Sequence, residues 1–405
     1  MSEPAKKPGQ QPEGYQPRKP EIVTMAAQAQ GKTHAKEPAT LPWPFQAGSP
    51  MKPSDYDFHF SGFRGLDFTN CFTGLYMYLE AIRDGGERSG SLTLANHAVQ
   101  HFFLFDTISG RSATVWGWGG KPTDVYGEIY DTDDTIGFVM GYAGYSYEKH
   151  TGNLMERIRA SLDTGIPVLA RLKTDGAYTD KKADSFRLIV DCDGNKLRVP
   201  APKGAQKASK KAPRPDEIDS IYVVTGRTRR NYTLPDALRR IKGVMERDRE
   251  AGVWDEYIQA FEDYWGRLQR CKLKELKALF QSVYRGTTWN CHNFVETFRT
   301  YNMNPECPER FGARVWDELK DARLEAPCNR MDAAYDDSHN RQWQLHALHD
   351  IRNWRSRYRH RWGSGMLNWS MCEMAATLLR MIKADDDAVY HAICEMIGIL
   401  EEGAA

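Results

Sequence analysis

The stretch that decides the fold reads Asp67-Phe68-Thr69-Asn70-Cys71-Phe72-Thr73-Gly74-Leu75-Tyr76-Met77-Tyr78-Leu79-Glu80. Apolar side chains at positions 72, 75, 76, 79 and 82 follow the i, i+3, i+4, i+7 spacing of one buried helix face. Asn70 is a good N-cap residue, so the pattern predicts a buried helix that begins just after it. Cys71 would then lie in the first helical turn.

Cys71 in that position has two interpretations. The free backbone N–H groups and the positive dipole end at a helix start favour the thiolate, which is the nucleophilic form of cysteine. The N–H groups near Asn70 and Cys71 would also hold an oxyanion during acyl transfer. The other interpretation is packing, because free cysteine is among the most buried residue types and is usually inert. The residues alone leave both interpretations open.

The composition describes a globular chain that is large enough for two domains. It has 405 residues, of which 41% are hydrophobic and 11% aromatic, and its formal net charge is +1. This charge balance argues against a nucleic-acid-binding face. The sequence contains neither a run of about 18 apolar residues nor the apolar core of a secretion signal. We expect a cytoplasmic protein without nucleic-acid or membrane partners.

The cysteines give no sign of a metal site or a disulfide framework. There are eight of them, widely spaced and without a Cys-x-x-Cys pair, which argues against a zinc ribbon. Scattered single cysteines suit a reducing cytosol. We therefore expect no metal and no cofactor.

Three regions follow one another along the chain. Residues 1–54 are rich in proline, glutamine and lysine, which predicts a disordered leader because such a composition buries too little apolar surface. Residues 55–228 mix helix and strand patterns, with a Lys/Ala/Pro insert at 200–215 that we expect to be exposed. Residues 233–401 carry only helical patterns and predict a bundle. The predicted fold class is α+β, followed by an all-helical C-terminal bundle.

Short turns link the strand patterns of residues 55–228, which indicates a largely antiparallel sheet. The predicted strands are 167–172, 186–190, 196–199 and 218–225, and the predicted helices are 92–105, 136–142 and 154–164. In the bundle the predicted helices are 235–250, 254–284, 287–301, 310–324, 330–360 and 366–401. Pro305, Pro308 and Pro327 are expected to break them.

Three short segments carry a resemblance to a known family. They are Asn70-Cys71-Phe72-Thr73, Gly165-Ile166-Pro167-Val168 and Ser185-Phe186-Arg187-Leu188-Ile189-Val190-Asp191-Cys192-Asp193. Their order resembles that of proteins similar to butirosin biosynthesis protein H, across roughly residues 60–400. The resemblance implies a papain-like N-terminal domain, as in bacteriocin-processing peptidases, and a helical C-terminal domain. It also implies acyl transfer from a carrier-protein thioester to an amine, with Cys71 as the nucleophile.

The chain departs from this family at the catalytic base. In such proteins the strand before the hairpin begins with a histidine, whereas this sequence has Ser185 or Phe186 there. Neither residue can take a proton from a thiol near neutral pH, as an imidazole does. Two functions follow. One is a cysteine-dependent acyltransferase or amide/thioester hydrolase that acts on a small-molecule or carrier-bound acyl group. The alternative is a non-catalytic ligand-binding relative that has lost its base.

Three histidines are candidates for supplying the missing base. His97 is the first choice, because the helix that carries it is expected to pack beside the Cys71 helix after a short loop. His101 lies four residues later and would share one helix face with it, while His292 would reach across from the C-terminal half. Each also has a structural interpretation, as a helix-surface or core histidine. As zinc ligands, His97 and His101 would make only half a site.

The segment Trp116-Gly117-Trp118-Gly119-Gly120 offers two large flat surfaces. Trp116 and Trp118 would form the walls of a ligand site, or else cover the core with their indoles. The expected partners are a small-molecule substrate or an acyl carrier protein. The arginine-rich segment 352–362 would bind phosphate groups of such a carrier, or pair with the acidic run 385–387 inside the bundle.

The carboxylates Asp131, Asp133 and Asp134 lie close together before the predicted helix 136–142. They would bind a cation or an amine, or else cap the helix that follows. The calcium-loop pattern is incomplete, since the glycine and glutamate it requires are missing. The sequence therefore favours the capping role.

Overall fold

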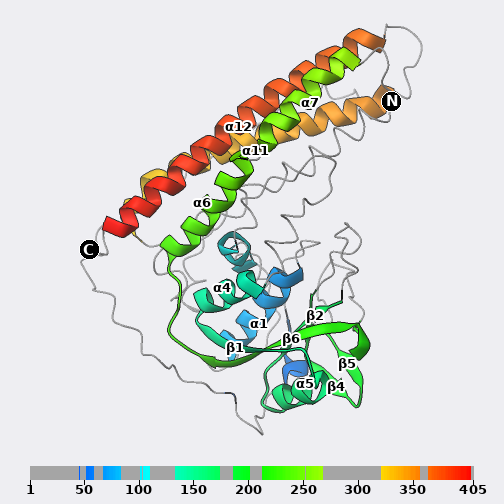
Figure 1. Cartoon of the computed structure of the whole chain (residues 1–405), viewed down its shortest axis with the longest axis vertical. Coiled ribbons are helices and arrows are strands. Elements are labelled where there is room, and N and C mark those ends of the chain that lie inside the picture. Colours follow the sequence, from blue (N-terminus) through cyan, green and yellow to red (C-terminus); the bar gives the residue numbers. More distant parts are fainter. Residues whose placement is uncertain are drawn as a thin grey trace, which may run out of the picture. The chain divides into compact units, whose positions relative to one another are not determined.

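The computed structural model describes residues 45, 52–58, 67–83, 101–102, 104–109, 133–173, 186–200, 212–250, 252–267, 321–355 and 364–402 (Figure 1). All of them belong to the compact unit Pro38–Ala405. They combine α-helices with two small antiparallel sheets. This confirms the α+β class in its coarse form.

The first helix, α1 (Asp67–Arg83), begins earlier than the sequence predicts. Asn70 is therefore not its N-cap, and Cys71 lies in the second turn rather than the first. The reason is tertiary packing. Phe68 is only 2% exposed, and its ring stacks on that of Phe72 with 5.9 Å between the centroids. This burial stabilises an additional turn, and tertiary context commonly overrides local preference in this way.

The helices that follow in the α/β region agree with their sequence patterns. They are α4 (Asp133–Ala143) and α5 (Leu154–Asp163). Gly165 after α5 has a φ of 86°, which is the left-handed conformation of a glycine C-cap. A helix is predicted at 92–105. Within it, residues 101–102 and 104–105 are helical, and the helical conformation continues to residue 108, beyond the predicted end. Burial of Ile108, which is 1% exposed, explains the extension.

Four antiparallel strands form the main sheet in the order β1-β6-β2-β3. They are β1 (Tyr145–His150), β2 (Val168–Leu172), β3 (Phe186–Ile189) and β6 (Ile218–Arg227). The sequence pattern does not predict β1, because half of its residues are polar and its apolar signal is weak. Pairing with the long strand β6, from Tyr145 opposite Arg227 to His150 opposite Ile221, supplies the missing stabilisation.

A separate hairpin consists of β4 (Asp191–Asp193) and β5 (Lys196–Arg198). Gly194 turns it with a φ of 58°, a conformation that glycine adopts without steric cost. The predicted hairpin at Asp193-Gly194 is thus confirmed.

Three short 3-10 helices complete the described elements: η1 (Pro53–Asp55), η3 (Pro215–Glu217) and η6 (Ala322–Leu324).

Four long helices make up the described part of the C-terminal half. They are α6 (Leu234–Glu250), α7 (Val253–Arg267), α11 (Glu325–Arg355) and α12 (Ser364–Glu402). The prediction that Pro327 breaks a helix is wrong. Pro327 lies in the first turn of α11, where its missing N–H would have no helical acceptor in any case. The predicted helix 287–301 lies outside the described residues.

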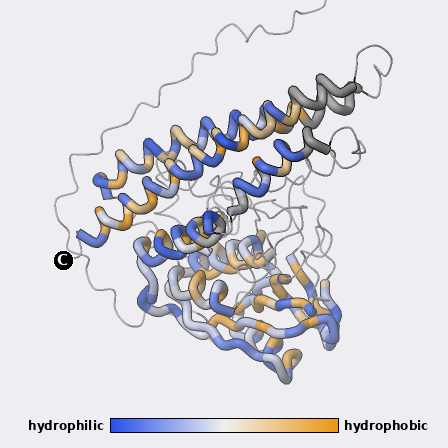
Figure 2. The backbone as a smooth tube through the Cα atoms, turned by 45° about the horizontal axis from the view of Figure 1, so that its top comes forward, coloured by the Kyte–Doolittle hydropathy of each residue, from blue (hydrophilic) through white to orange (hydrophobic). Residues whose placement is uncertain are grey.

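Apolar clusters hold these elements together. One joins α1, α4 and the main sheet to α6 and the end of α12, a second lies between α7, α11 and α12, and a third lies between α5 and the sheet. Figure 2 shows polar and apolar residues alternating along the long helices, as expected when one face of each is buried. Phe45 belongs to the first cluster, and its ring lies 5.9 Å from that of Tyr78.

Candidate functional site

The candidate nucleophile lies on a helix that is buried along most of its length. Cys71 is 6% exposed and Asn70 8% exposed, whereas every other side chain from residue 68 to residue 80 is at most 3% exposed. Among residues 68–80 of α1, these two are therefore the most exposed. Asn70 and Cys71 are neighbours in the chain and share this position, but the Cys71 thiol is largely covered.

An aromatic shell surrounds the turn that carries Cys71. The ring centroid of Phe68 lies 5.3 Å from that of Phe186, and the centroid of Phe72 lies 4.7 Å from that of Phe105. Phe186 is the first residue of β3 and is fully buried. Strand β3 packs directly against α1. Phe186, one of the two residues where the resemblance predicts a histidine, thus lies against α1.

His101 is fully buried in aromatic packing. Its ring lies 5.2 Å from that of Tyr76 and 6.3 Å from that of Phe105, measured between centroids. Tyr76 follows Cys71 by five residues, which corresponds to about 7.5 Å along a helix axis and about 140° around it. The described contacts therefore associate His101 with a different part of α1 from Cys71.

Four other candidates, His97, Trp116, Trp118 and His292, lie outside the described residues. Their roles as base or ligand walls remain predictions. So does the phosphate-binding role of segment 352–362.

A buried polar cluster on the same helix was not anticipated from the sequence. Glu80 of α1 is 1% exposed, and it accepts hydrogen bonds from the Tyr145 hydroxyl and from Nη2 of Arg227, the latter at 3.1 Å. Tyr145 begins β1 and Arg227 ends β6, where the two residues pair across the strands. The sequence does contain a signal of this cluster: the charged residue Glu80 follows Tyr76 by four residues and so interrupts an otherwise apolar helix face.

Asp133 joins the start of α4 to the main sheet. Its carboxylate accepts hydrogen bonds from Nζ of Lys149 at 2.6 Å and from the Tyr222 hydroxyl at 2.7 Å, with Arg171 at 3.7 Å. Asp134 pairs instead with Arg240 of α6 at 2.7 Å. These carboxylates lie in the first turn of α4 and link it to other elements of this chain, whereas the capping role that the sequence favoured is not among their described contacts.

The pKa of Asp133 is lowered, first by the hydrogen bond from Lys149 and then by that from Tyr222. A carboxylate with a lowered folded-state pKa stabilises the fold above its ordinary pKa, and this contribution disappears as the pH falls through the folded-state value. We expect Asp133→Asn to weaken the dependence of the unfolding free energy on pH below about 4. The effect at pH 7 should stay below about 1 kcal/mol, because the side chain is 55% exposed.

Urea unfolding of Asp133→Asn at pH 7 and pH 3 measures this difference. Asp163→Asn, at the exposed end of α5, serves as the control and should keep the pH dependence of the parent. An unchanged acid dependence in Asp133→Asn would contradict the assignment.

The acidic run of α12 is neutralised by two arginines from other helices. Asp385 pairs with Arg341 of α11, while Asp386 and Asp387 pair with Arg249 of α6. The described partners of the run are thus Arg341 and Arg249, and its predicted pairing with segment 352–362 stays a prediction. Within the described ranges, no group of three or more His, Cys, Asp and Glu residues is placed to hold a metal ion.

No family model matches this sequence, and neither a curated protein nor a solved structure shows significant similarity to it. Among the helices that the structure describes, none has the length and apolar character needed to cross a bilayer.

Proposed function

We propose that this chain is a papain-like protein that binds an acyl ligand without catalysing acyl transfer. The observation that carries the proposal is the contact between Phe68 and Phe186, with 5.3 Å between ring centroids. Phe68 precedes Cys71 by three residues, so the two side chains lie on neighbouring parts of one helix face. The start of β3 therefore lies beside the part of α1 that carries Cys71, which supports the proposal.

Neither residue at the position of the expected histidine, Ser185 or Phe186, can act as a base near neutral pH. A phenylalanine ring has no atom that takes a proton from a thiol, whereas the family's histidine does. The low exposure of Cys71, 6%, also supports a packed thiol rather than an attacking one. The ligand class follows from the resemblance: an acyl group on a small molecule or on the thiol arm of a carrier protein. Trp116 and Trp118 are the predicted walls of its site.

Replacing Phe186 with histidine tests this arrangement. If β3 begins beside Cys71, the new imidazole should stabilise the thiolate, and Cys71 should react with iodoacetamide about tenfold faster at pH 7 than in the parent. Peptide mass spectrometry identifies the labelled residue. Burial raises the pKa of Cys328 and of Cys372 to about 12, so these two thiols should contribute little background.

Phe186→Leu is the matched control, since it also removes the buried ring but adds no base. Thermal unfolding of both variants shows whether they remain folded. A folded Phe186→His protein that labels no faster than Phe186→Leu would contradict the placement of β3 beside Cys71.

A second candidate function is the cysteine-dependent acyltransferase or amide/thioester hydrolase. It is favoured by the position of Asn70 and Cys71, which are the most exposed of residues 68–80 although the thiol itself is largely covered. In this case the base would come from His97 or His292. A substrate would reach the thiol at these two residues.

Incubation with a short-chain acyl-pantetheine thioester separates the two functions. The non-catalytic proposal expects quenching of tryptophan fluorescence on binding, with no release of free pantetheine thiol above background. Thiol release that disappears in Cys71→Ala would establish the enzyme instead. His97→Gln and His292→Gln would then identify the base by a loss of about 10²–10⁴ in turnover.

A further inference from the structure

A small polar cavity lies where α7, α11 and α12 meet. The lining side chains with a polar atom are Trp254 of α7, Tyr335, Ser338 and Gln342 of α11, and Asp385 and Asp386 of α12. The cavity volume is about 10 Å³, roughly the space that one water molecule requires. The surrounding packing is otherwise apolar.

Two buried atoms of opposite hydrogen-bonding character face this region. The indole Nε1–H of Trp254 and the amide Oε1 of Gln342 make no hydrogen bond within the described part of the chain. The two residues are 3% and 8% exposed. The amide nitrogen of Gln342 is already used, since it donates to Oγ of Ser338 at 3.2 Å. A buried donor and a buried acceptor are costly when unsatisfied, so together they indicate a bound polar molecule.

The charges around the cavity narrow the choice of ligand. Asp385 pairs with Arg341, and Asp386 lies 3.4 Å from Arg249, so both carboxylates already have cationic partners. The N–H of Trp254 disfavours a cation, and the two carboxylates disfavour an anion. A neutral molecule that both donates and accepts satisfies the lining, and the volume admits only a very small one.

We propose that this cavity is a binding site for one ordered water molecule that bridges α7 and α11. The water accepts a hydrogen bond from the Trp254 indole and donates one to Oε1 of Gln342. An aspartate carboxylate of α12 takes its second hydrogen. The site thereby joins three helices and penalises any shift in their register, because a shift would bury these polar groups without partners.

NMR spectroscopy of the full chain with ¹⁵N-labelled tryptophan tests this site. A long-lived water should give a dipolar cross peak with the Trp254 indole proton. In rotating-frame spectra dipolar cross peaks and exchange cross peaks have opposite signs, so the sign distinguishes a bound water from hydrogen exchange. Trp254→Phe assigns the resonance. The indole of Trp343, which is 58% exposed, is the reference for contact with bulk water.

Gln342→Leu removes the acceptor while keeping a side chain of similar size. We expect the water cross peak of Trp254 to be lost in this variant and retained in Gln344→Leu, which alters an exposed amide of the same helix. A Trp254 indole that shows no water contact in the parent would overturn the proposal. A cross peak that persists in Gln342→Leu would overturn the bridging role. Added potassium or ammonium ions should leave the Trp254 resonance unchanged, and a saturable shift would mean that the site binds a cation instead.

Discussion

Arg227→Met is expected to destabilise the fold by about 3–5 kcal/mol, the usual cost of removing one partner from a buried ion pair. Arg227 is paired with Glu80 at 3.1 Å, and the two side chains are 7% and 1% exposed. The substitution would remove the Arg227 charge from beside the buried Glu80 carboxylate. Because α1 and β6 meet at this pair, the loss should affect the packing of the helix on the sheet.

Arg198→Met provides the matched control. Arg198 pairs with Asp191 at 3.1 Å, the same distance, but these side chains are 57% and 32% exposed. An exposed pair of this kind contributes about 0–1 kcal/mol. Chemical denaturation of both variants at pH 7 therefore compares a buried pair and an exposed pair within one protein.

A triple variant tests the cause of the loss. Glu80→Leu, Arg227→Met and Tyr145→Phe together replace the polar cluster with apolar side chains of similar size. Such replacements are often neutral or stabilising, by about 1–4 kcal/mol. We expect the triple variant to recover most of the stability that Arg227→Met loses. If Arg227→Met alone were as stable as the parent, the pair of Arg227 with Glu80 would not contribute to stability as expected.

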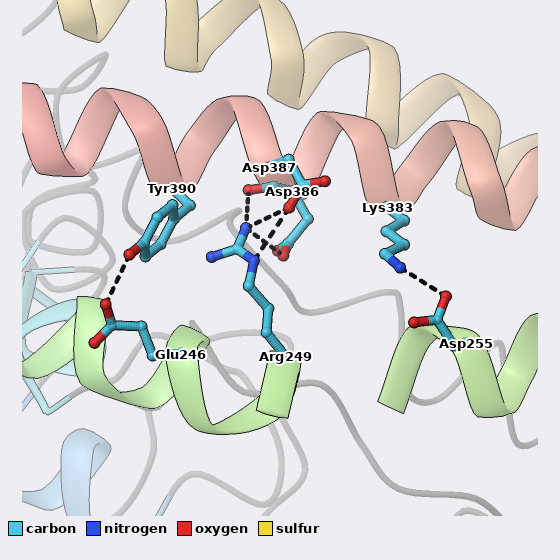
Figure 3. A network of polar contacts seen from close by, with 7 residues as sticks. All are labelled: Glu246, Arg249, Asp255, Lys383, Asp386, Asp387 and Tyr390. Carbon is cyan, nitrogen blue, oxygen red and sulfur yellow. Dashed lines mark hydrogen bonds and ion pairs between the residues drawn. The ribbon is translucent and has the colours of Figure 1, made fainter. Parts of the chain in front are cut away.

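Arg249→Met is expected to lower the unfolding free energy by about 2–3 kcal/mol, somewhat less than a fully buried pair because the arginine is partly exposed. Figure 3 shows Arg249 of α6 extending toward Asp386 and Asp387 of α12. The nearest contact is 2.8 Å to Asp387, and the guanidinium lies 4.0 Å from the centre of the Tyr390 ring. Asp386 is only 8% exposed, so its charge would lose a partner in a largely buried position.

Two further variants separate charge from geometry at this contact. Arg249→Lys keeps the charge but loses the planar fork and the stacking on Tyr390, so we expect an intermediate loss. Arg239→Met is the control on the same helix, since its pair with Glu401 is about half exposed and should contribute less than about 1 kcal/mol. Equal stability losses in Arg249→Met and Arg239→Met would contradict the importance of burial.

The contacts on either side of Arg249 explain why this position matters. The Tyr390 hydroxyl donates to Glu246 at 2.7 Å, and Lys383 pairs with Asp255 at 2.6 Å (Figure 3). These pairs join α6 and α7 to the single helix α12, on both sides of the break at Gly252. The loss of Arg249 would remove the pair on the α6 side of that break, three positions from Gly252.

The sequence alone was sufficient for elements whose signal is local. The apolar spacing after residue 71 identified α1, and the turn residues Asp193-Gly194 identified the β4–β5 hairpin. Local patterns succeed here because each helix face or tight turn is encoded by residues a few positions apart. The sequence also showed that the strand at 186–190 lacks the histidine expected from the family resemblance.

Other features depended on partners far away in the chain, and only the tertiary structure decided them. Tyr145 and Arg227, the partners of Glu80, lie 65 and 147 positions from it. The extra turn of α1 depends on the packing of Phe68, and strand β1 depends on pairing with β6. The contact between Phe186 and the cysteine helix likewise results from the strand order of the sheet. No local pattern encodes such contacts, because long-range burial and pairing set the energies that decide them.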